Sequence, residues 1–155
     1  MLKNIDYKKL IIFIVGTFLI GGFFAIFTTT NNYGNLIKPF EVPSYIFPVV
    51  WSILYLLMAI SLYLVSESFT YISKTKAYTL YLYQLIANSL WTLLFFGFNL
   101  RLFSFLWIIL IIVLVVLMIR EFLKINKVAG YLQIPYLLWL LFAAYLNLSI
   151  YILNR

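Results

Sequence analysis

The sequence predicts an all-α protein, an integral membrane bundle of five transmembrane helices in a single domain over residues 1–155. Three observations support this fold class. First, 66% of the residues are hydrophobic and 10% are charged, whereas about 25% are charged in an ordinary soluble domain. Second, the charged residues divide the chain into uncharged runs: residues 10–37, 42–66, 77–100, 102–119 and 128–154. Third, each run, as a helix, can cross a hydrocarbon core, which requires about 20 residues.

The first helix is predicted over residues 8–28. Lysines precede it, as in a signal peptide, but its apolar stretch is too long and has no convincing small-residue cleavage site after Phe27, so we expect it to be retained. Thr17, Gly21 and Ala25 recur along it at steps of four, a spacing that lets helices approach closely within lipid. The partner helix would belong either to the same bundle or to a second copy in a homodimer.

The second helix, predicted over residues 43–67, follows the longest connection, residues 28–43 (TTTNNYGNLIKPFEVP). With its Asn, Gly and Pro residues, this connection can fold over the mouth of the bundle or serve as a plain connector. The third helix is predicted over residues 76–99, and a tight hairpin joins it to the fourth.

The fourth helix is predicted over residues 101–122 and the fifth over residues 128–153. Ser104 and the indole of Trp107 are the polar side-chain groups of the fourth uncharged run, so we expect this helix to form a lipid-facing wall. Its segment IILIIVLVV, residues 108–116, also lacks the apolar/polar alternation of a transmembrane β-strand.

The distribution of basic residues predicts the orientation. The N-terminus and the loops after the second and fourth helices carry eight Lys and Arg residues, whereas the opposite side carries three. This asymmetry predicts a cytoplasmic N-terminus and an external C-terminus. The net charge of +7 is then explained by topological anchors on an anionic leaflet, so we expect no nucleic-acid partner.

Several kinds of chemistry are excluded by composition. The chain contains no His and no Cys, which excludes disulfides, zinc sites, thiol nucleophiles, His general bases and His-ligated haem. All four carboxylates flank the helices rather than lying within them, which disfavours a proton-coupled pump or an ion channel. We expect no metal site and no required cofactor, and a metal-free macrocycle or a sterol suits the interior better than haem.

Polar and aromatic residues share one face on each of three helices, at steps of three and four residues. They are Trp51, Tyr55 and Met58 on the second helix, Gln84, Asn88, Trp91 and Phe95 on the third, and Pro135, Trp139, Ala143 and Asn147 on the fifth. In one interpretation the amides form interhelical hydrogen bonds, of about 0.6 kcal/mol each. In the other, tryptophans near the middle of the spans line a pocket for a flat, largely apolar ligand.

The blocks that carry these residues resemble a known family, the tryptophan-rich sensory proteins, also called translocator or peripheral-type benzodiazepine receptor proteins. The similarity covers almost the whole chain. The blocks are residues 38–39 (KP) with 48–58 (PVVWSILYLLM), residues 84–91 (QLIANSLW) with 95–97 (FFG), and residues 135–142 (PYLLWLLF) with Leu146 and Asn147. Their order and spacing together make the resemblance specific.

The resemblance implies frequent homodimers and a pocket beneath the first long loop. In the family this pocket binds porphyrins such as protoporphyrin IX, benzodiazepine-site ligands and, in animal members, cholesterol. Bacterial members are linked to light- and oxygen-dependent porphyrin degradation that involves pocket tryptophans. The loop tryptophans of the family are absent from residues 38–45 (KPFEVPSY), so the loop contacts carry over poorly. A bacterial membrane contains little sterol, and we therefore discount sterol transport.

We expect a porphyrin-type ligand to bind among the first, second, third and fifth helices, beneath the loop of residues 28–43. The candidate ligand-binding residues are Tyr33, Pro43, Trp51, Tyr55, Gln84, Asn88, Trp91, Trp139, Ala143, Leu146 and Asn147. Lys38 is the candidate contact for a propionate, and Trp51 and Trp139 are the candidate catalytic residues for photo-oxidation of the ligand.

Two alternatives stay open. One is a sensor or transporter that binds a tetrapyrrole or lipid without transforming it, and the other is a purely structural bundle. Composition, rich in Lys, Ile and Asn, favours a bacterial plasma membrane as the location. The expected partners are a porphyrin or similar flat apolar ligand, membrane lipid and a second copy of the chain.

Overall fold

The computed structural model describes residues 5–28, 33–43 and 45–155, and within these ranges it contains helices and no β-strand. The elements are α1 (Tyr7–Gly22), the 3₁₀ segment η1 (Phe23–Phe27), α2 (Ile46–Glu67), α3 (Thr75–Thr92), the π-helical segment η2 (Leu93–Gly97), α4 (Arg101–Ile125), α5 (Lys127–Tyr131) and α6 (Ile134–Leu153). They make up five spans that are long and apolar enough to cross a membrane. The prediction of a five-helix transmembrane bundle is confirmed.

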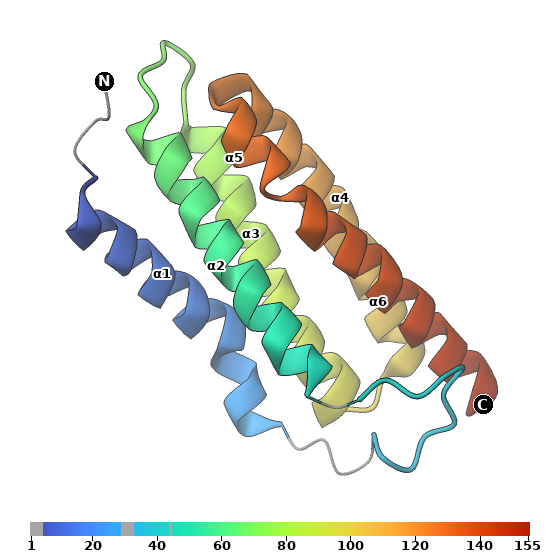
Figure 1. Cartoon of the computed structure of the whole chain (residues 1–155). Coiled ribbons are helices and arrows are strands. Elements are labelled where there is room, and N and C mark those ends of the chain that lie inside the picture. The colour runs from blue at the N-terminus through green and yellow to red at the C-terminus, as the bar shows by residue number, and fades with distance from the viewer. Residues whose placement is uncertain (1–4, 29–32, 44) are drawn as a thin grey trace.

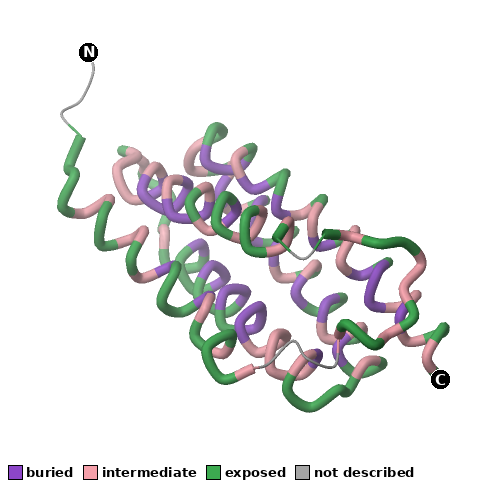
Figure 2. The backbone as a smooth tube through the Cα atoms, turned by 60° about the horizontal axis from the view of Figure 1, so that its bottom comes forward, coloured by how far each residue is buried: buried purple, intermediate pink, exposed green. Residues whose placement is uncertain are grey.

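The helices lie side by side in one bundle (Figure 1), with α1 against α2 and α3 at one edge. On the other side α4 contacts α3 and α6, and α5 bridges α2 and α4. The two ends of the chain lie at opposite ends of the bundle (Figure 1), as an odd number of spans requires. Buried residues concentrate on the inner faces of the helices (Figure 2), and α1 contributes few of them.

The expectation that the fourth helix is a lipid-facing wall is wrong for one of its faces. Ile111, Val115, Met118 and Phe122 follow one another at helical steps and are each 0% exposed, whereas Leu106 on another face is 56% exposed. Ser104, the polar residue of this run with a hydroxyl, is also 0% exposed and lies on the same face. The remaining positions are almost all apolar, so hydropathy alone gives little periodic signal to separate the core face from the lipid face.

The fifth run is broken into α5 and α6, although the sequence predicts one helix over residues 128–153. Pro135 lies in the first turn of α6, where its missing N–H costs no hydrogen bond, so a new helix begins there. Gly130 in α5 lies against Leu123 so closely that an added Cβ would be 2.4 Å from Leu123 Cδ2. The break therefore lets α5 pack tightly on α4.

The other helix ends differ from the prediction by a few residues. The first and third helices end in the tighter η1 and the wider η2. The helix α2 begins at Ile46, whose N–H donates to the carbonyl of Pro43 at 3.0 Å, so Pro43 lies outside it. The fourth helix continues past residue 122 to Ile125, because charged side chains end an apolar run without ending backbone hydrogen bonding. Asn126 then caps α5 by accepting from Ala129 N.

Two of the small residues of α1 pack against other helices of the same chain. Thr17 Oγ1 lies 2.6 Å from the hydroxyl of Tyr81. The carbonyl of Gly21 accepts a hydrogen bond from the hydroxyl of Tyr55 at 2.9 Å, and an added Cβ would lie 2.6 Å from Tyr55 Cε1. At these two positions the close approach serves packing of α1 on α2 and α3, whereas Ala25 is exposed.

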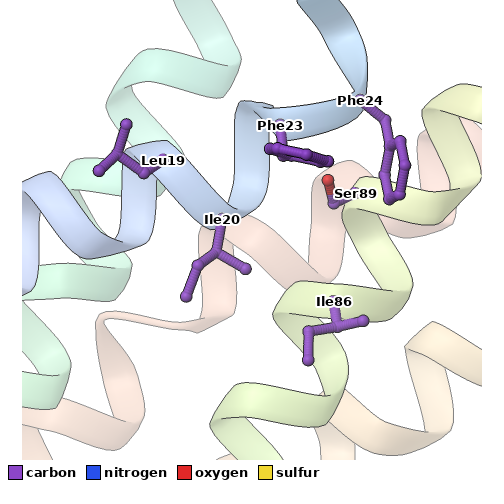
Figure 3. A pocket seen from close by; sticks show the side chains of 6 residues that line it. All are labelled: Leu19, Ile20, Phe23, Phe24, Ile86 and Ser89. Atoms are coloured by element: carbon purple, nitrogen blue, oxygen red, sulfur yellow. The ribbon is translucent and has the colours of Figure 1, made fainter. Parts of the chain in front are cut away.

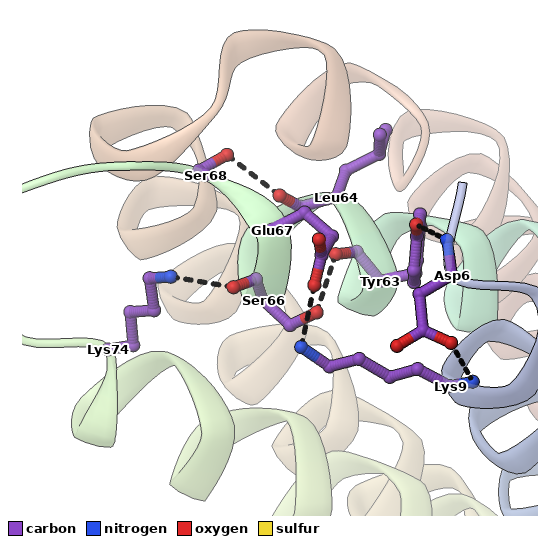
Figure 4. A network of polar contacts seen from close by, with 8 residues as sticks. All are labelled: Asp6, Lys9, Tyr63, Leu64, Ser66, Glu67, Ser68 and Lys74. Carbon is purple, nitrogen blue, oxygen red and sulfur yellow. Dashed lines mark hydrogen bonds and ion pairs between the residues drawn. The ribbon is translucent and has the colours of Figure 1, made fainter. Parts of the chain in front are cut away.

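A polar network ties the start of α1 to the end of α2 (Figure 4). Lys9 Nζ lies 2.7 Å from Glu67 Oε1. The backbone N–H of Asp6 donates to the Tyr63 hydroxyl, and Asp6 caps α1 by accepting from Lys9 N. Because few side chains of α1 are buried, these contacts contribute much of what fixes its first turn.

Candidate functional site

Aromatic side chains fill the space between α2 and α6. Phe47, Trp51 and Tyr55 follow one another at steps of four on α2. The Phe47 ring meets Trp139 of α6, the Trp51 ring meets Tyr136 of α6, and the Tyr55 ring packs on Trp51. The ring centroids are 6.1 Å apart for Phe47 and Trp139 and 6.2 Å apart for Trp51 and Tyr136. We call these five residues the aromatic seam. It contains both candidate catalytic tryptophans and Tyr55.

The predicted amides of α3 contact this seam from a third side. Gln84 is 0% exposed, and its Oε1 accepts a hydrogen bond from the Tyr136 hydroxyl at 2.8 Å. Asn88 Nδ2 donates to the Tyr55 hydroxyl at 3.1 Å, and that hydroxyl donates in turn to the Gly21 carbonyl. The structure therefore brings together three helices whose polar faces were assigned from helical phase.

A second group lies nearer the end of the bundle that carries the long loop. Trp91 stacks on Phe95 with the ring centroids 5.2 Å apart, and its Nε1 donates to Asn147 Oδ1 at 3.2 Å. The buried Leu146 packs in the same cluster as Phe95. Tyr33 of the loop joins this group to the seam, because its ring lies 6.2 Å from Phe95 and 6.1 Å from Phe47.

The described part of the long loop lies across the end of α6. The backbone N–H and carbonyl of Ile37 both bond to the side chain of Asn154, at 2.9 and 2.8 Å. Phe40 stacks on Tyr145 with centroids 6.5 Å apart. Figure 1 shows the loop crossing from α2 to the C-terminal end. This geometry favours the interpretation of the loop as a cover. We call the contact between Ile37 and Asn154 the latch.

Lys38 lies with Tyr33 in this cover. Its Nζ is 4.8 Å from the centre of the Tyr33 ring and 3.8 Å from Glu41 Oε2, and its side chain is 10% exposed. Pro43 and Ala143 contribute less: Pro43 is exposed, and Ala143 is half-buried one helical turn from Trp139. The structure therefore brings the other predicted residues into two adjoining groups and the cover, whereas no described side-chain contact joins Pro43 or Ala143 to them.

Two buried donors of the site have no hydrogen-bond partner within the described part of the chain: the Tyr33 hydroxyl and Trp139 Nε1. The rings of both residues contact Phe47. A buried donor without a partner costs about 1–3 kcal/mol. Burial, and secondarily the charge of Glu41, raises the pKa of the Tyr33 phenol, so this hydroxyl stays protonated and remains a donor at neutral pH.

A cavity of about 300 Å³ lies elsewhere, between α1 with η1 and α3 (Figure 3). Its walls are apolar except for Ser89, whose buried hydroxyl has no partner among the described residues and points toward Phe23 and Phe24. This cavity contains none of the predicted site residues. Because the polar groups converge on the seam, we place the candidate site there and not at this hollow.

Sequence reasoning missed some residues of the site. Phe47 lies four residues before Trp51, so the same periodicity could have identified it. Asn154 could not be found, because its partner is the backbone of a loop residue. No group of three His, Cys, Asp or Glu side chains that could hold a metal occurs within the described ranges.

The fold and the site together define the class: an integral membrane protein of five helices with an aromatic and amide-lined interior site. The family model described as TspO/MBR matches residues 10–153. The chain belongs to the TspO/MBR family. It is 38% identical to "Tryptophan-rich protein TspO" of Archaeoglobus fulgidus over 136 residues. The matched residues make up 86% of this chain and 87% of that protein.

Two further relatives support the assignment. "Tryptophan-rich sensory protein" of Cereibacter sphaeroides is 34% identical over 124 residues, 79% of this chain and 76% of its own length. "Protein CrtK" of Rhodobacter capsulatus is 33% identical over 132 residues, 84% of this chain and 82% of its own length. The similarity therefore extends over most of each protein, and the resemblance drawn from the sequence is confirmed at the level of the family.

Proposed function

We propose that the protein binds a porphyrin-type tetrapyrrole, such as protoporphyrin IX, among α2, α3 and α6 beneath the loop. The observation that carries the proposal is the pair of buried, unpartnered donors, Tyr33 Oη and Trp139 Nε1, whose rings both contact Phe47. A flat ligand with acceptor groups satisfies both donors when it enters between these rings.

The surrounding residues suit such a ligand. The rings of Trp51, Trp139 and Phe47 offer faces on which a planar macrocycle can stack. Lys38 and the Tyr33 hydroxyl lie together in the cover and supply a cation and a donor for a propionate carboxylate. Binding requires the seam rings to separate, since they contact one another in this structure.

We further propose that the bound porphyrin undergoes light- and oxygen-dependent degradation. The excited porphyrin and oxygen supply the reactivity, and the protein supplies positioning and the redox-active indoles of Trp51 and Trp139. Trp51→Phe and Trp139→Phe should slow the light-driven loss of porphyrin absorbance relative to the wild type. Unchanged turnover in both variants would remove the indoles from the mechanism.

Binding is tested by quenching of tryptophan fluorescence with protoporphyrin IX in detergent micelles. Tyr33→Phe removes one unpartnered donor and should weaken binding about fivefold, the equivalent of about 1 kcal/mol for one hydrogen bond. Tyr45→Phe is the matched control, because Tyr45 is 68% exposed in the same loop region. Equal affinity of the wild type and Tyr33→Phe would contradict the assignment of this hydroxyl to the ligand.

The second candidate function, a sensor or transporter without catalysis, is favoured by one observation, the latch. The loop backbone is bonded to α6 through the single side chain of Asn154, and the other described loop contacts are between aromatic rings, so the cover can open and close, which suits a gate. Porphyrin bleaching at identical rates in the protein and in empty micelles, together with saturable binding, would favour this candidate over degradation.

A further inference from the structure

A second cavity, of about 410 Å³, lies at the end of the bundle where α3 turns into α4 and α6 ends. Its lining includes Asn99, Arg101, Leu102, Phe103, Asn154 and Arg155. Asn99 has a positive φ of 54°, a conformation that Asn tolerates better than most residues. This turn places Arg101 at the start of α4, beside the last residues of α6.

The two guanidinium groups of this cavity lack counterions within the described part of the chain. The ion pairs of the described residues join lysines to Glu41, Glu67 and Glu121, and neither Arg101 nor Arg155 takes part. Glu67 and Glu121 lie near the opposite end of the bundle, at the ends of α2 and α4. Positive charge is therefore concentrated around an open cavity, where an anion would be attracted.

The first turn of α4 adds to this potential. It contains no acidic residue, and Leu100 at its N-cap makes no side-chain hydrogen bond to it. A helix N-terminus carries a partial positive charge that usually favours acidic residues. Here Arg101 occupies the first helical position instead. The excess of positive charge is thus not compensated by the helix itself.

The remaining walls indicate what kind of anion fits. Leu102 is 44% exposed and Phe103 is 48% exposed, and both belong to a helix that spans the membrane. Lipid chains therefore contact them, and the cavity lies where α4 begins, close to the level of the headgroups. A free inorganic anion would pair with the arginines but would make no favourable contact with the apolar side chains. A phospholipid can pair with the arginines through its phosphate and contact the apolar side chains through its acyl chains.

We propose that this cavity binds the headgroup of an anionic phospholipid. The phosphate lies between Arg101 and Arg155, and the acyl chains follow Leu102 and Phe103. The proposal is independent of the tetrapyrrole site, because the residues assigned to the phospholipid, Arg101, Arg155, Leu102 and Phe103, are not in the aromatic seam and the ligand chemistry is different. Arg101 and Asn154 nevertheless connect the two regions, since the Arg101 carbonyl accepts from Asn147 at 2.9 Å and Asn154 forms the latch.

The test is native mass spectrometry of the protein released from neutral detergent micelles, with phosphatidylglycerol, phosphatidylcholine of the same chains and inorganic phosphate as probes. The wild type should retain one phosphatidylglycerol molecule roughly tenfold more tightly than phosphatidylcholine. Arg101→Gln with Arg155→Gln should abolish that preference. Arg120→Gln, which removes one arginine at the exposed other end of α4, is the control for each single substitution and should keep the preference.

Two further variants separate binding from folding. Arg101→Lys keeps the charge and should retain most of the preference, and Arg155→Gln changes an exposed residue beyond the end of α6 and should weaken the preference without affecting thermal unfolding. The proposal is overturned if phosphatidylcholine is retained equally, if Arg120→Gln has the same effect as the double variant, or if inorganic phosphate at equal concentration displaces the lipid.

Discussion

At the scale of single residues, the contact between Gly21 and Tyr55 connects three helices. Tyr55 of α2 donates to the Gly21 carbonyl of α1 and accepts from Asn88 of α3. The hydroxyl can reach both because Gly21 has no Cβ. A side chain at this position therefore disturbs two hydrogen bonds at once.

We expect Gly21→Ala to destabilise the protein by about 1–3 kcal/mol, the usual effect of overpacking a core. The added Cβ would lie 2.6 Å from Tyr55 Cε1 and displace the ring. Unfolding by SDS in mixed micelles measures the change. Gly16→Ala is the matched control on the same helix, since an added Cβ there meets nothing within 4 Å. Equal stability of the two variants would contradict this account.

The buried pair of Gln84 and Tyr136 allows a second prediction. Gln84→Leu should destabilise the protein by about 1–3 kcal/mol, because the Tyr136 hydroxyl, 1% exposed as a residue, loses its acceptor. Adding Tyr136→Phe removes the orphaned hydroxyl and should restore most of the lost stability in the same unfolding assay. Additive losses in the double variant would show that the hydrogen bond is not the cause.

Helical phase predicted much of the candidate site at this scale. Gln84, Asn88 and Tyr55 share one interior because residues at steps of three and four lie on one face, whatever the tertiary fold. Helical phase could not predict hydrogen bonds from side chains to backbone groups. Asn147 donates to the carbonyl of Arg101, and every residue has a carbonyl, so no residue type in the sequence marks this contact.

At the scale of elements, charged residues predicted the five spans but not their internal breaks. An uncharged run marks a segment that can cross the hydrocarbon core, because burying a charged side chain in hydrocarbon is costly. The break before α6 depends on backbone hydrogen bonding and on Pro135, and η2 depends on a local widening of the helix. Neither changes the hydropathy of the run, so hydropathy could not show them.

The latch yields a prediction for the loop. Asn154→Ala removes the side chain that bonds both backbone groups of Ile37, so the amide of Ile37 should exchange with solvent roughly fivefold faster or more, as expected for loss of about 1 kcal/mol. Hydrogen-exchange mass spectrometry of the loop peptide measures this. Asn35→Ala, at an exposed position of the same loop, should leave the rate at Ile37 unchanged.

At the scale of the whole molecule, the distribution of basic residues predicts the orientation. Eight of the eleven basic residues lie in the segments assigned to the side of the N-terminus, and we therefore expect that side to face the cytoplasm. The absence of cysteine from the sequence makes a direct test simple, since any single cysteine introduced is unique.

Phe69→Cys and Asn99→Cys should react from opposite sides of the membrane with an impermeant maleimide. Phe69, 92% exposed, lies between α2 and α3, and the exposed Asn99 lies between α3 and α4. In intact cells whose outer layer admits the reagent, Asn99→Cys should be labelled and Phe69→Cys should require lysis. The reverse pattern would invert the orientation.

The latch also has a consequence for biosynthesis. Ile37 and Asn154 are separated by 117 positions in the chain, and at about 5–20 residues per second a ribosome needs roughly 6–23 s to add that many. During this interval the loop already exists and Tyr33 can contact Phe47 and Phe95, but the latch cannot form because Asn154 has not been added. The interior between α2 and α6 is therefore enclosed last, after the final span has entered the membrane, and the nascent protein is at its most accessible to a bulky planar molecule just before synthesis is finished.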